Sequence, residues 1–477
     1  MPPCFIHCIR WSAAGIVWSV EERVRKRNTA EVRPGGQYVL YWCSRGRRAE
    51  WNHALEFAIR LANERRLPLL VFESLSCDYA EANARLHTFA LEGVPEFAAA
   101  LRRRGIGYCF HLPRRKGEPD PIAGPLAAEA AAIVTDDHPL ERPAADCGDA
   151  AWYAVDASCI VPARSIPQRA YAAYSLRPKI RKLLPQFLLP VKQERVKHRF
   201  ALPLPAFHTE VCAENVARLV AECEIDPSVT PVAATPGGRR EALHRLARFL
   251  EHGLRRYARE KNEPSAHATS GLSPYLRAGY ISSLEVAMAV QQVAAEHRWI
   301  AGEFLEELIV RRELAFNFAW HARRLDSLRE LPEWAQATLR KHRRDRRDPA
   351  YNGRQFAAAR THDDLWNAAQ RELLLRGTIH GYYRMYWGKK ILEWSHTPKE
   401  ALATMVHLHD RYALDGQDPN TYANILWCFG LHDRPWPERP VYGTVRSMSR
   451  AGMERKTNVA AYLEEIARLE QSGGEAA

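Results

Sequence analysis

Two tryptophans, Trp387 and Trp394, have a spacing at which aromatic side chains could pass an electron. They lie in the segment 382–395, which is rich in helix formers and holds no proline. Seven residues make two helical turns, so both indoles are expected on one face, about 10 Å apart along the axis. Indole is easily oxidised, which favours electron transfer in short hops. The alternative, which spacing alone favours, is a pair of core anchors on a buried helix.

A second candidate site is the string TSGLSP at 269–274. Hydroxyl groups and a glycine ahead of a helix, with proline in its first turn, can offer donors to an anion at the helix N-terminus. An ordinary helix cap uses the same residue types. The string therefore predicts either a phosphate site or a simple helix start.

Positive charge dominates the chain of 477 residues, which has a formal net charge of +12 and an isoelectric point near 9.2. A polyanionic partner is expected, nucleic acid first and an anionic membrane surface second. The run RKHRRDRR at 340–347 concentrates this charge, although such runs are usually solvated surface. No stretch of 18 apolar residues exists, so no membrane span is expected.

The elements that must position these residues fall into two parts. In the first, short apolar runs alternate with helical segments, which indicates a doubly wound parallel sheet with helices on both faces. The expected strands are 38–42, 68–72, 108–111, 131–135 and 152–155, and the expected helices are 49–65, 80–104 and 121–130. A nucleotide or chromophore would bind beyond the carboxyl ends of these strands.

From Arg239 onward, apolar residues recur every three or four positions, so the second part is expected to be an all-α bundle. Between the two parts, frequent prolines predict a linker that does not continue as a helix. The expected divisions are an N-terminal extension (1–36), an α/β domain (37–161), an interdomain linker (162–238), a helical domain (239–470) and a disordered tail (471–477).

The ten cysteines are scattered, with no CxxC pair and no spacing suited to zinc or an iron–sulfur cluster. Free thiols in a reducing compartment are the simplest interpretation, so we expect a cytoplasmic protein without a bound metal. Residues 1–20 lack a convincing signal-peptide pattern.

Several strings in the second part carry a family resemblance: GYYRMYWGKKILEW at 381–394, DRYALDGQDPN at 410–420 and HDRPWPERPVYG at 432–443, supported by SGLSPYL at 270–276 and EFLEELIVRREL at 303–314. Together they resemble the flavin-binding helical domain of class II cyclobutane-pyrimidine-dimer photolyases. The resemblance runs from about residue 21 to about residue 469. It implies FAD in the helical domain and UV-damaged DNA as the partner of a monomeric enzyme.

By this resemblance, one group of residues holds the cofactor. The string at 269–273 would bind the FAD diphosphate, with Tyr257 contributing from the preceding helix. Arg384 and Asp415 would form a salt bridge at the isoalloxazine edge, where the cation stabilises anionic flavin. The implied cofactor-binding residues are Tyr257, Thr269, Ser270, Gly271, Leu272, Ser273, Arg384, His409 and Asp415.

A second group would act on the substrate and on the electron. Trp387, Trp366 and Trp394 match the chain through which light reduces the flavin. Glu313 would hydrogen-bond the thymine dimer, although a carboxylate beside two arginines is most often a solvated ion pair. Asn317 and Met385 would lie near Glu313, and Trp427 and Trp436 would pack on the flipped-out dimer. Contacts to the DNA backbone are expected from Arg340, Lys341, Arg343 and Arg344.

The sequence departs from the class II pattern at several positions. His409 stands where the family usually has an asparagine facing flavin N5, and a histidine ordinarily titrates near neutral pH. Phe316 replaces an aspartate beside the substrate. In the α/β domain, four residues differ around the expected site of a light-harvesting antenna, a deazaflavin or a folate, and they are Trp51, His53, Asp137 and Glu141.

Two functions from different classes follow. The first is a repair enzyme in which photoexcited reduced FAD gives an electron to a cyclobutane pyrimidine dimer, and it is supported by Glu313, Trp427, Trp436 and the basic charge. The alternative, favoured by His409 and Phe316, is a cryptochrome-like blue-light receptor that binds FAD without repairing DNA. A weaker third possibility is a nucleic-acid-binding flavoprotein without a role for light.

Overall fold

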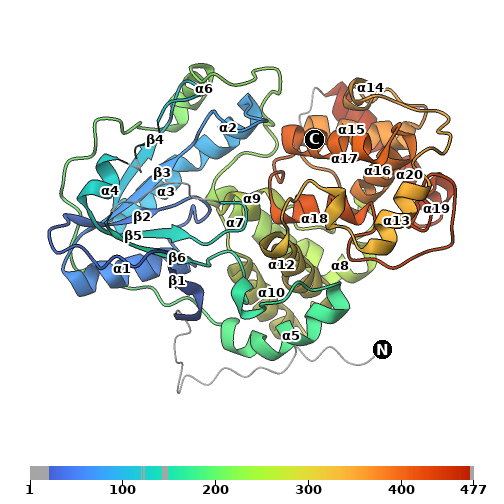
Figure 1. Ribbon diagram of the computed structural model, residues 1–477. Helices are drawn as coiled ribbons and strands as arrows, with labels where there is room; N and C mark the ends of the chain where they lie inside the picture. The colour runs from blue at the N-terminus through green and yellow to red at the C-terminus, as the bar shows by residue number, and fades with distance from the viewer. Residues whose placement is uncertain (1–20, 120, 122–123, 142–148, 473–477) are drawn as a thin grey trace.

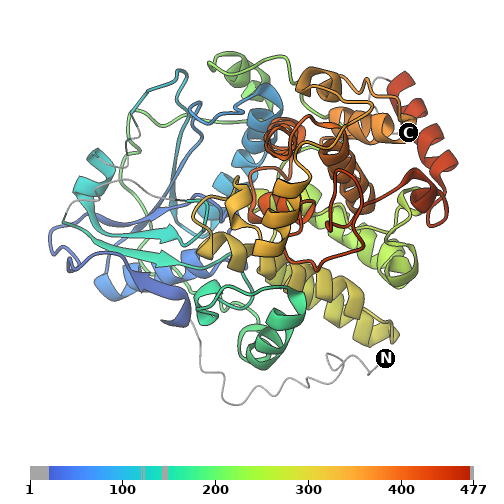
Figure 2. The same cartoon turned by 45° about the vertical axis from the view of Figure 1, so that its right-hand side comes forward.

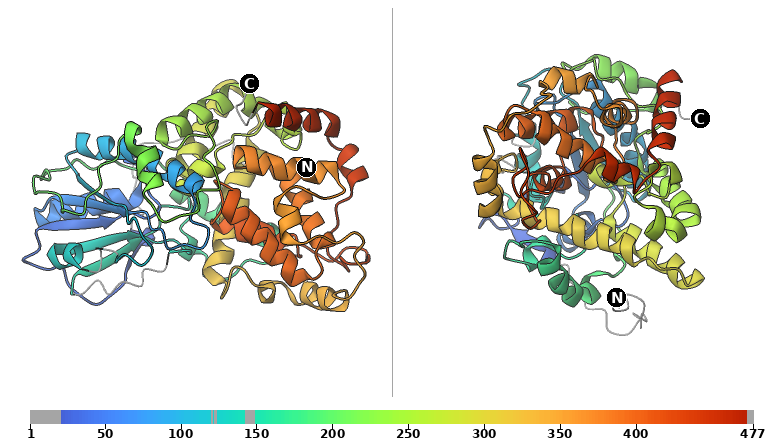
Figure 3. Two further views of the ribbon diagram at one scale, coloured as in Figure 1. Left: turned by 90° about the horizontal axis from the view of Figure 1, so that it is seen from above. Right: turned by 90° about the vertical axis from the view of Figure 1, so that its right-hand side faces the viewer.

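The computed structural model describes residues 21–119, 121, 124–141 and 149–472, so the expectation for residues 1–20 and most of that for 471–477 lie outside the described residues. An α/β part and a helical part lie side by side (Figures 1 and 3). In the described residues, no helix is both long enough and apolar enough to cross a bilayer.

The α/β part is built on a sheet whose strands have the order β1-β6-β5-β2-β3-β4. All neighbouring strands are parallel except β1, which pairs antiparallel with β6 at one edge. The strands are β1 (Val24–Lys26), β2 (Tyr38–Trp42), β3 (Leu69–Ser74), β4 (Gly107–His111), β5 (Ala130–Asp136) and β6 (Ala151–Val155). The five predicted strands are confirmed within one or two residues. The three residues of β1, inside the expected extension, are too short to give a sequence pattern.

Helices cover both faces of this sheet, as predicted, but with shorter bounds. They are α1 (His53–Arg65), α2 (Ala84–Glu92), α3 (Val94–Arg103) and α4 (Pro125–Glu129). The helix expected over 49–65 begins only at His53, because the Asn52 side chain caps the backbone N–H groups of residues 54 and 55. The helix expected over 80–104 is two helices, separated at Gly93 with a proline in the first turn of α3.

The expected linker contains a helix of 15 residues, α5 (Ala173–Phe187), and a short one, α6 (Val216–Ala221). Two prolines lie inside α5, and an interior proline costs about 3 kcal/mol. Leu176, Ile180, Leu184 and Phe187 outweigh this cost, because each is buried and contributes about 1.5 to 3 kcal/mol. Figures 1 and 2 show α5 beside the helical part, and its buried residues share the core of that part.

After the expected linker, the next helix begins at Arg239, and the domain boundary placed there stays a prediction. The helices of the helical part are α7 (Arg239–Arg248), α8 (Leu254–Glu260), α9 (Ser273–Ala278), α10 (Ser283–His297), α11 (Gly302–Leu305), α12 (Arg312–His321), α13 (Glu333–Lys341), α14 (Gly353–Ala357), α15 (Asp364–Arg376), α16 (Gly381–Trp394), α17 (Pro398–Tyr412), α18 (Pro419–Trp427), α19 (Arg450–Glu454) and α20 (Val459–Gln471). Two π-helical segments, η6 (Phe249–Gly253) and η8 (Glu306–Arg311), join α7 to α8 and α11 to α12. The largest core of this part packs α15, α16, α17 and α18 together.

One grouping in the α/β part was not indicated by sequence spacing. Ligand atoms of Cys77, His87 and Cys223 all lie within 4.8 Å of one another. Burial lowers the pKa of His87 to about 4, so its ring is neutral. The three residues come from three separate segments, so no sequence motif indicates this group.

Candidate functional site

Three tryptophans form a continuous aromatic path through the helical part. Trp366 on α15 stacks on Trp387 of α16, with ring centroids 6.4 Å apart and planes 6° from parallel. The ring of Trp394, two turns further along α16, lies 6.3 Å from Trp366. Trp366 therefore fills the gap that the helical spacing of the other two leaves. The Trp366 indole N–H donates to the Trp387 carbonyl at 2.9 Å, which fixes the pair.

The path runs from the interior toward the surface. Trp366 and Trp387 are fully buried, and Trp394 contacts Tyr351 and the exposed His362 at centroid distances of 6.0 and 4.8 Å. Tyr351 is an oxidisable ring that the sequence did not single out, because it stands 43 residues before Trp394 without any motif. The arrangement allows an electron to enter from the protein surface and travel inward in three short steps.

At the inner end, Arg384 and Asp415 form the predicted salt bridge, with Nη2 and Oδ2 3.0 Å apart. Arg384 lies one helical turn before Trp387 on α16, so both side chains face the same region. Burial raises the pKa of Asp415, but the charge of Arg384, the His409 ring and a hydrogen bond from the Ser273 hydroxyl outweigh burial and leave that pKa below its ordinary value. Asp415 is therefore ionised.

His409 lies beside this ion pair, with Nε2 3.9 Å from Oδ1 of Asp415. The side chain is 2% exposed, and burial together with the positive charge of Arg384 lowers its pKa to about 3. The expectation that His409 titrates near neutral pH is therefore wrong, because its charged form would be desolvated next to a guanidinium group. His409 is a neutral ring across the physiological range.

Three polar atoms around the ion pair are buried and have no hydrogen-bond partner in the described protein: Nε of Arg384, Nδ1 of His409 and Oδ1 of Asp415. Buried polar groups are almost always hydrogen-bonded, so three such atoms together indicate a missing partner. They comprise one donor, one acceptor and one nitrogen that can be either. A planar heterocycle with donors and acceptors along one edge fits this set.

The string predicted to bind phosphate lies next to the same ion pair, since the Ser273 hydroxyl is close enough to Asp415 to lower the pKa of its carboxyl. Gly271 has φ of 62°, a left-handed conformation that favours glycine, and a Cβ there would lie 3.3 Å from Nη1 of Arg245. Thr269 and Ser273 are exposed, whereas Leu272 is buried and offers only its backbone. Arg245 thus adds a cation that sequence reasoning missed.

Tyr257 does not contact this string. Its ring packs against Phe249 and Phe304 and lies under Lys261, 5.7 Å from Nζ. The structure brings together Ser273, Arg384, His409 and Asp415, but leaves Tyr257 in an aromatic cluster with its own cation.

Glu313 and Asn317 bind backbone groups of the segment 160–170. They stand one turn apart on α12, only 5% and 3% exposed. Oε1 of Glu313 accepts the backbone N–H groups of residues 160 and 161 at 2.7 and 3.2 Å. Oδ1 of Asn317 accepts the N–H of residue 170, and its amide donates to two carbonyls nearby. Both side chains fasten the segment 160–170 to the helical part, and their contact with a substrate stays a prediction.

Burial raises the pKa of Glu313 to about 8 despite those two backbone donors and the nearby charge of Arg312. Its second oxygen is buried without a partner, which a proton on that oxygen makes tolerable. Phe316, which lies between Glu313 and Asn317 in the sequence, packs under the Arg312 guanidinium, 4.5 Å from its ring centroid. A phenyl ring here therefore stabilises an arginine that donates to the Ser158 carbonyl.

Trp427 and Trp436 lie on either side of one cation. The guanidinium of Arg446 is 5.8 Å from the Trp427 ring and 5.0 Å from the Trp436 ring. Lys389 lies over Trp427 at 4.6 Å, and burial lowers its pKa to about 8. Both indoles are partly exposed, so they form a wall of aromatic faces and positive charge. Met385 is half-buried on α16, and the sequence analysis did not single out Arg446 or Lys389.

The basic run 340–347, which begins in the last turn of α13, divides into two kinds of side chain. Lys341, expected on the DNA backbone, forms an ion pair with Glu438 at 2.6 Å. Arg340, Arg343 and Arg344 are exposed and make no ion pair within the described part of the chain. The three arginines, and not the lysine, therefore present free charge.

A family model for DNA photolyase matches residues 39–197. A deoxyribodipyrimidine photo-lyase of Methanothermobacter thermautotrophicus is 38% identical over 454 residues, covering 93% of this chain and 98% of the relative. One of the same name from Potorous tridactylus is 36% identical over 442 residues, covering 90% of this chain and 81% of the relative.

Solved structures share the fold at much lower identity. A bacterial class III photolyase from Agrobacterium tumefaciens has a TM-score of 0.65 and 16% identity, with 92% of both chains covered. A cryptochrome from Synechocystis sp. PCC6803 has a TM-score of 0.66 and 15% identity, with 91% of this chain and 89% of that chain covered. At these identities the likeness shows the fold alone.

Proposed function

This chain belongs to the DNA photolyase family, and on that premise we propose that it is a class II type enzyme that repairs cyclobutane pyrimidine dimers in DNA, using FAD and light. The observation that carries the proposal is the set of partnerless buried atoms on Arg384, His409 and Asp415. The edge of an isoalloxazine ring offers a partner to each of them. Ser273, Gly271 and Arg245 would hold the diphosphate beside that edge.

When bound and reduced, FAD supplies a light-excited electron that splits the dimer and is then returned. The chain's own residues prepare this chemistry in two ways. Arg384 places a buried positive charge beside the ring edge, which favours negative charge there. Trp387, Trp366 and Trp394 lead from that edge to the surface in steps of about 6 Å between ring centroids, so reducing electrons have a path inward.

The lesion would be held by the wall of Trp427, Arg446 and Trp436. Stacking of an extrahelical base on such rings contributes about 1 to 3 kcal/mol per base. The Arg446 guanidinium lies against both rings and can also neutralise a phosphate of the flipped nucleotide.

One observation favours the receptor function. His409 is neutral and buried 3.9 Å from Asp415, so it offers a fixed ring nitrogen where an asparagine amide is usual in the family.

A second, antenna chromophore remains a prediction. At its expected place, beyond β2 and β5, the Asp136 carboxylate accepts three backbone N–H groups, those of residues 44, 45 and 46.

The experiment that tests the proposal compares binding in the dark with repair under blue light. Purified protein is expected to contain FAD, to bind dimer-bearing duplex more tightly than undamaged duplex, and to restore it only when illuminated. Arg446→Ala should weaken dark binding by about tenfold, with Arg439→Ala, an exposed arginine in the same segment, as the control. Equal affinity for damaged and undamaged duplex would favour the receptor function.

A further inference from the structure

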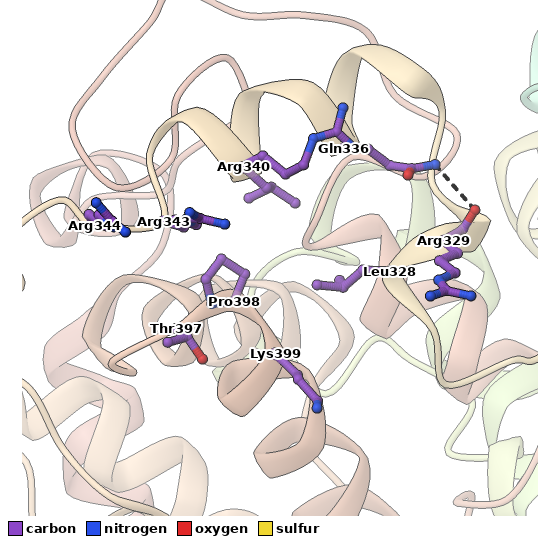
Figure 4. A pocket seen from close by; sticks show the side chains of 10 residues that line it. Leu328, Arg329, Gln336, Arg340, Arg343, Arg344, Thr397, Pro398 and Lys399 are labelled. Atoms are coloured by element: carbon purple, nitrogen blue, oxygen red, sulfur yellow. Dashed lines mark hydrogen bonds between the residues drawn. The ribbon is translucent and has the colours of Figure 1, made fainter.

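A hollow lies on the surface of the helical part, between α13 and the first turn of α17. Its volume is about 470 Å³. Figure 4 shows Arg343 and Arg344 on the side of α13, Lys399 on the side of α17, and Leu328 and Pro398 between them. The lining residues are Leu328, Arg329, Gln336, Leu339, Arg340, Arg343, Arg344, Thr397, Pro398 and Lys399. We call this hollow the α13–α17 groove.

Five of the ten lining residues carry a positive charge, and none carries a negative one. In the described part of the chain, none of these five cations forms an ion pair. Two neighbours in the same basic run do: Lys341 pairs with Glu438, and Arg346 pairs with Asp348. Neither of the two paired cations lines the groove. Concentrated, unneutralised charge around one hollow attracts an anion more strongly than the same charge spread over a surface.

The floor of the groove is apolar, since Leu339 and Pro398 are buried and Leu328 is half-buried. Thr397 caps α17, a helix of 15 residues whose positive end opens on the groove. Cations around an apolar floor suit a ligand that combines phosphates with flat or apolar groups. A nucleic acid strand has this chemistry, with phosphates for the arginines and sugars or bases for the floor.

The groove lies one helix away from the Trp427–Trp436 wall. On its other side, α13 contacts the segment that carries Trp436: Oγ1 of Thr338 accepts the N–H of Thr444 at 2.9 Å, and Lys341 reaches Glu438. A helix with its side chains is about 10 to 12 Å across. Because a strand of duplex DNA carries one phosphate per roughly 3.4 Å along its axis, this width corresponds to about three nucleotides.

We propose that the α13–α17 groove binds the DNA strand about three nucleotides from the lesion, with Arg343 and Arg344 on successive phosphates. This inference rests on the proposed function and adds the path of the DNA beyond the damaged base. The contacts are to the backbone, so they supply affinity without sequence preference. They hold the strand while the wall takes the flipped nucleotide.

The test measures dark binding of dimer-bearing duplex over a range of potassium chloride concentrations. Each lost phosphate contact lowers the slope of log K against log salt by about 0.9. Arg343→Ala and Arg344→Ala are each expected to lower it by that amount, and the double variant by about twice as much. Arg346→Ala removes the same charge from the same run, but from an arginine that is 87% exposed and paired with Asp348, and should leave the slope nearly unchanged.

The possible outcomes distinguish failure of the groove proposal from failure of the proposed function. A slope that falls equally in Arg346→Ala and in the groove variants would overturn the groove, because net charge alone would then explain binding. Unchanged slopes in the groove variants, with light-driven repair intact in the unmodified protein, would also overturn the groove while leaving the proposed function in place. Absence of any binding preference for damaged duplex in the unmodified protein would remove both.

Discussion

The indole rings of Trp366 and Trp387 lie parallel with centroids 6.4 Å apart, although the residues are 21 positions apart in the sequence and belong to different helices. The hydrogen bond from the Trp366 indole to the Trp387 backbone carbonyl locks this arrangement. Trp366 also lies within 6.3 Å of Trp394. It is therefore the middle member of the path, and its removal opens the widest gap.

Trp366→Phe is expected to abolish or strongly slow the light-driven reduction of bound FAD by an external thiol. Phenylalanine fills most of the space but is much harder to oxidise. The measurement is the absorbance of oxidised flavin during anaerobic illumination. Trp152→Phe, in the sheet, is the control, since Trp152 is buried outside the path. Photoreduction at the unmodified rate in Trp366→Phe would show that electrons reach the flavin by another route.

Arg384→Met should cost about 3 kcal/mol of folding stability, because it leaves the Asp415 carboxylate buried and unpaired. The double variant Arg384→Met/Asp415→Leu should recover most of that stability, since no charge is then left without a partner. Both variants are expected to bind FAD at least tenfold more weakly, as followed by flavin fluorescence. FAD affinity that recovers together with stability in the double variant would show that the ion pair has only a structural role.

His409→Asn isolates the effect of the buried histidine on stability. The folded pKa of His409 is about 3, below the ordinary value of 6.5, so only the unfolded chain takes up a proton between these values. The stability of the unmodified protein should fall relative to His409→Asn by about 1.4 kcal/mol for each pH unit below 6.5. Urea unfolding of both proteins at pH 7.5, 6.0 and 5.0 measures this. A constant difference across the range would contradict a buried, neutral ring.

Glu313→Gln should show the opposite trend. The folded pKa of Glu313 is about 8 and its ordinary value is 4.5, so the folded protein holds a proton that the unfolded chain releases. Between those values, the stability of the unmodified protein falls as pH rises, by about 1.4 kcal/mol per unit, whereas glutamine does not titrate. The variant should therefore gain stability relative to the unmodified protein between pH 5 and pH 8. The variant should still repair dimers, because Glu313 holds the backbone of residues 160 and 161. Loss of repair with unchanged stability would show that Glu313 contacts the substrate.

Much of this arrangement could be predicted from sequence where the signal is local. The 3.6-residue period placed Trp387 and Trp394 on one face of α16, and the alternation of apolar runs with helices gave the sheet. Motif strings brought Arg384 and Asp415 together. Signals that depend on distant partners could not be found this way. The family resemblance assigned Glu313 and Asn317 to the substrate, and spacing could not show that they bind backbone about 150 positions earlier.

Burial was the other property hidden from the sequence. The pKa of His409 lies far below its ordinary value because the surrounding core excludes water and the positive charge of Arg384 disfavours the protonated ring. Arg446 and Arg245 carry no motif, and only the folded chain shows that they lie against Trp436 and Gly271. The two prolines of α5 do lower the local stability of the helix, but burial of its apolar side chains outweighs that cost.

One paired measurement on a single sample shows whether the reduced flavin of this protein repairs dimers. The purified protein is illuminated anaerobically until its spectrum shows full reduction, and dimer-bearing DNA is then added to the same sample under blue light. We expect dimers to disappear while the flavin stays reduced, with many dimers lost per protein molecule. Full reduction with no loss of dimers would contradict this expectation.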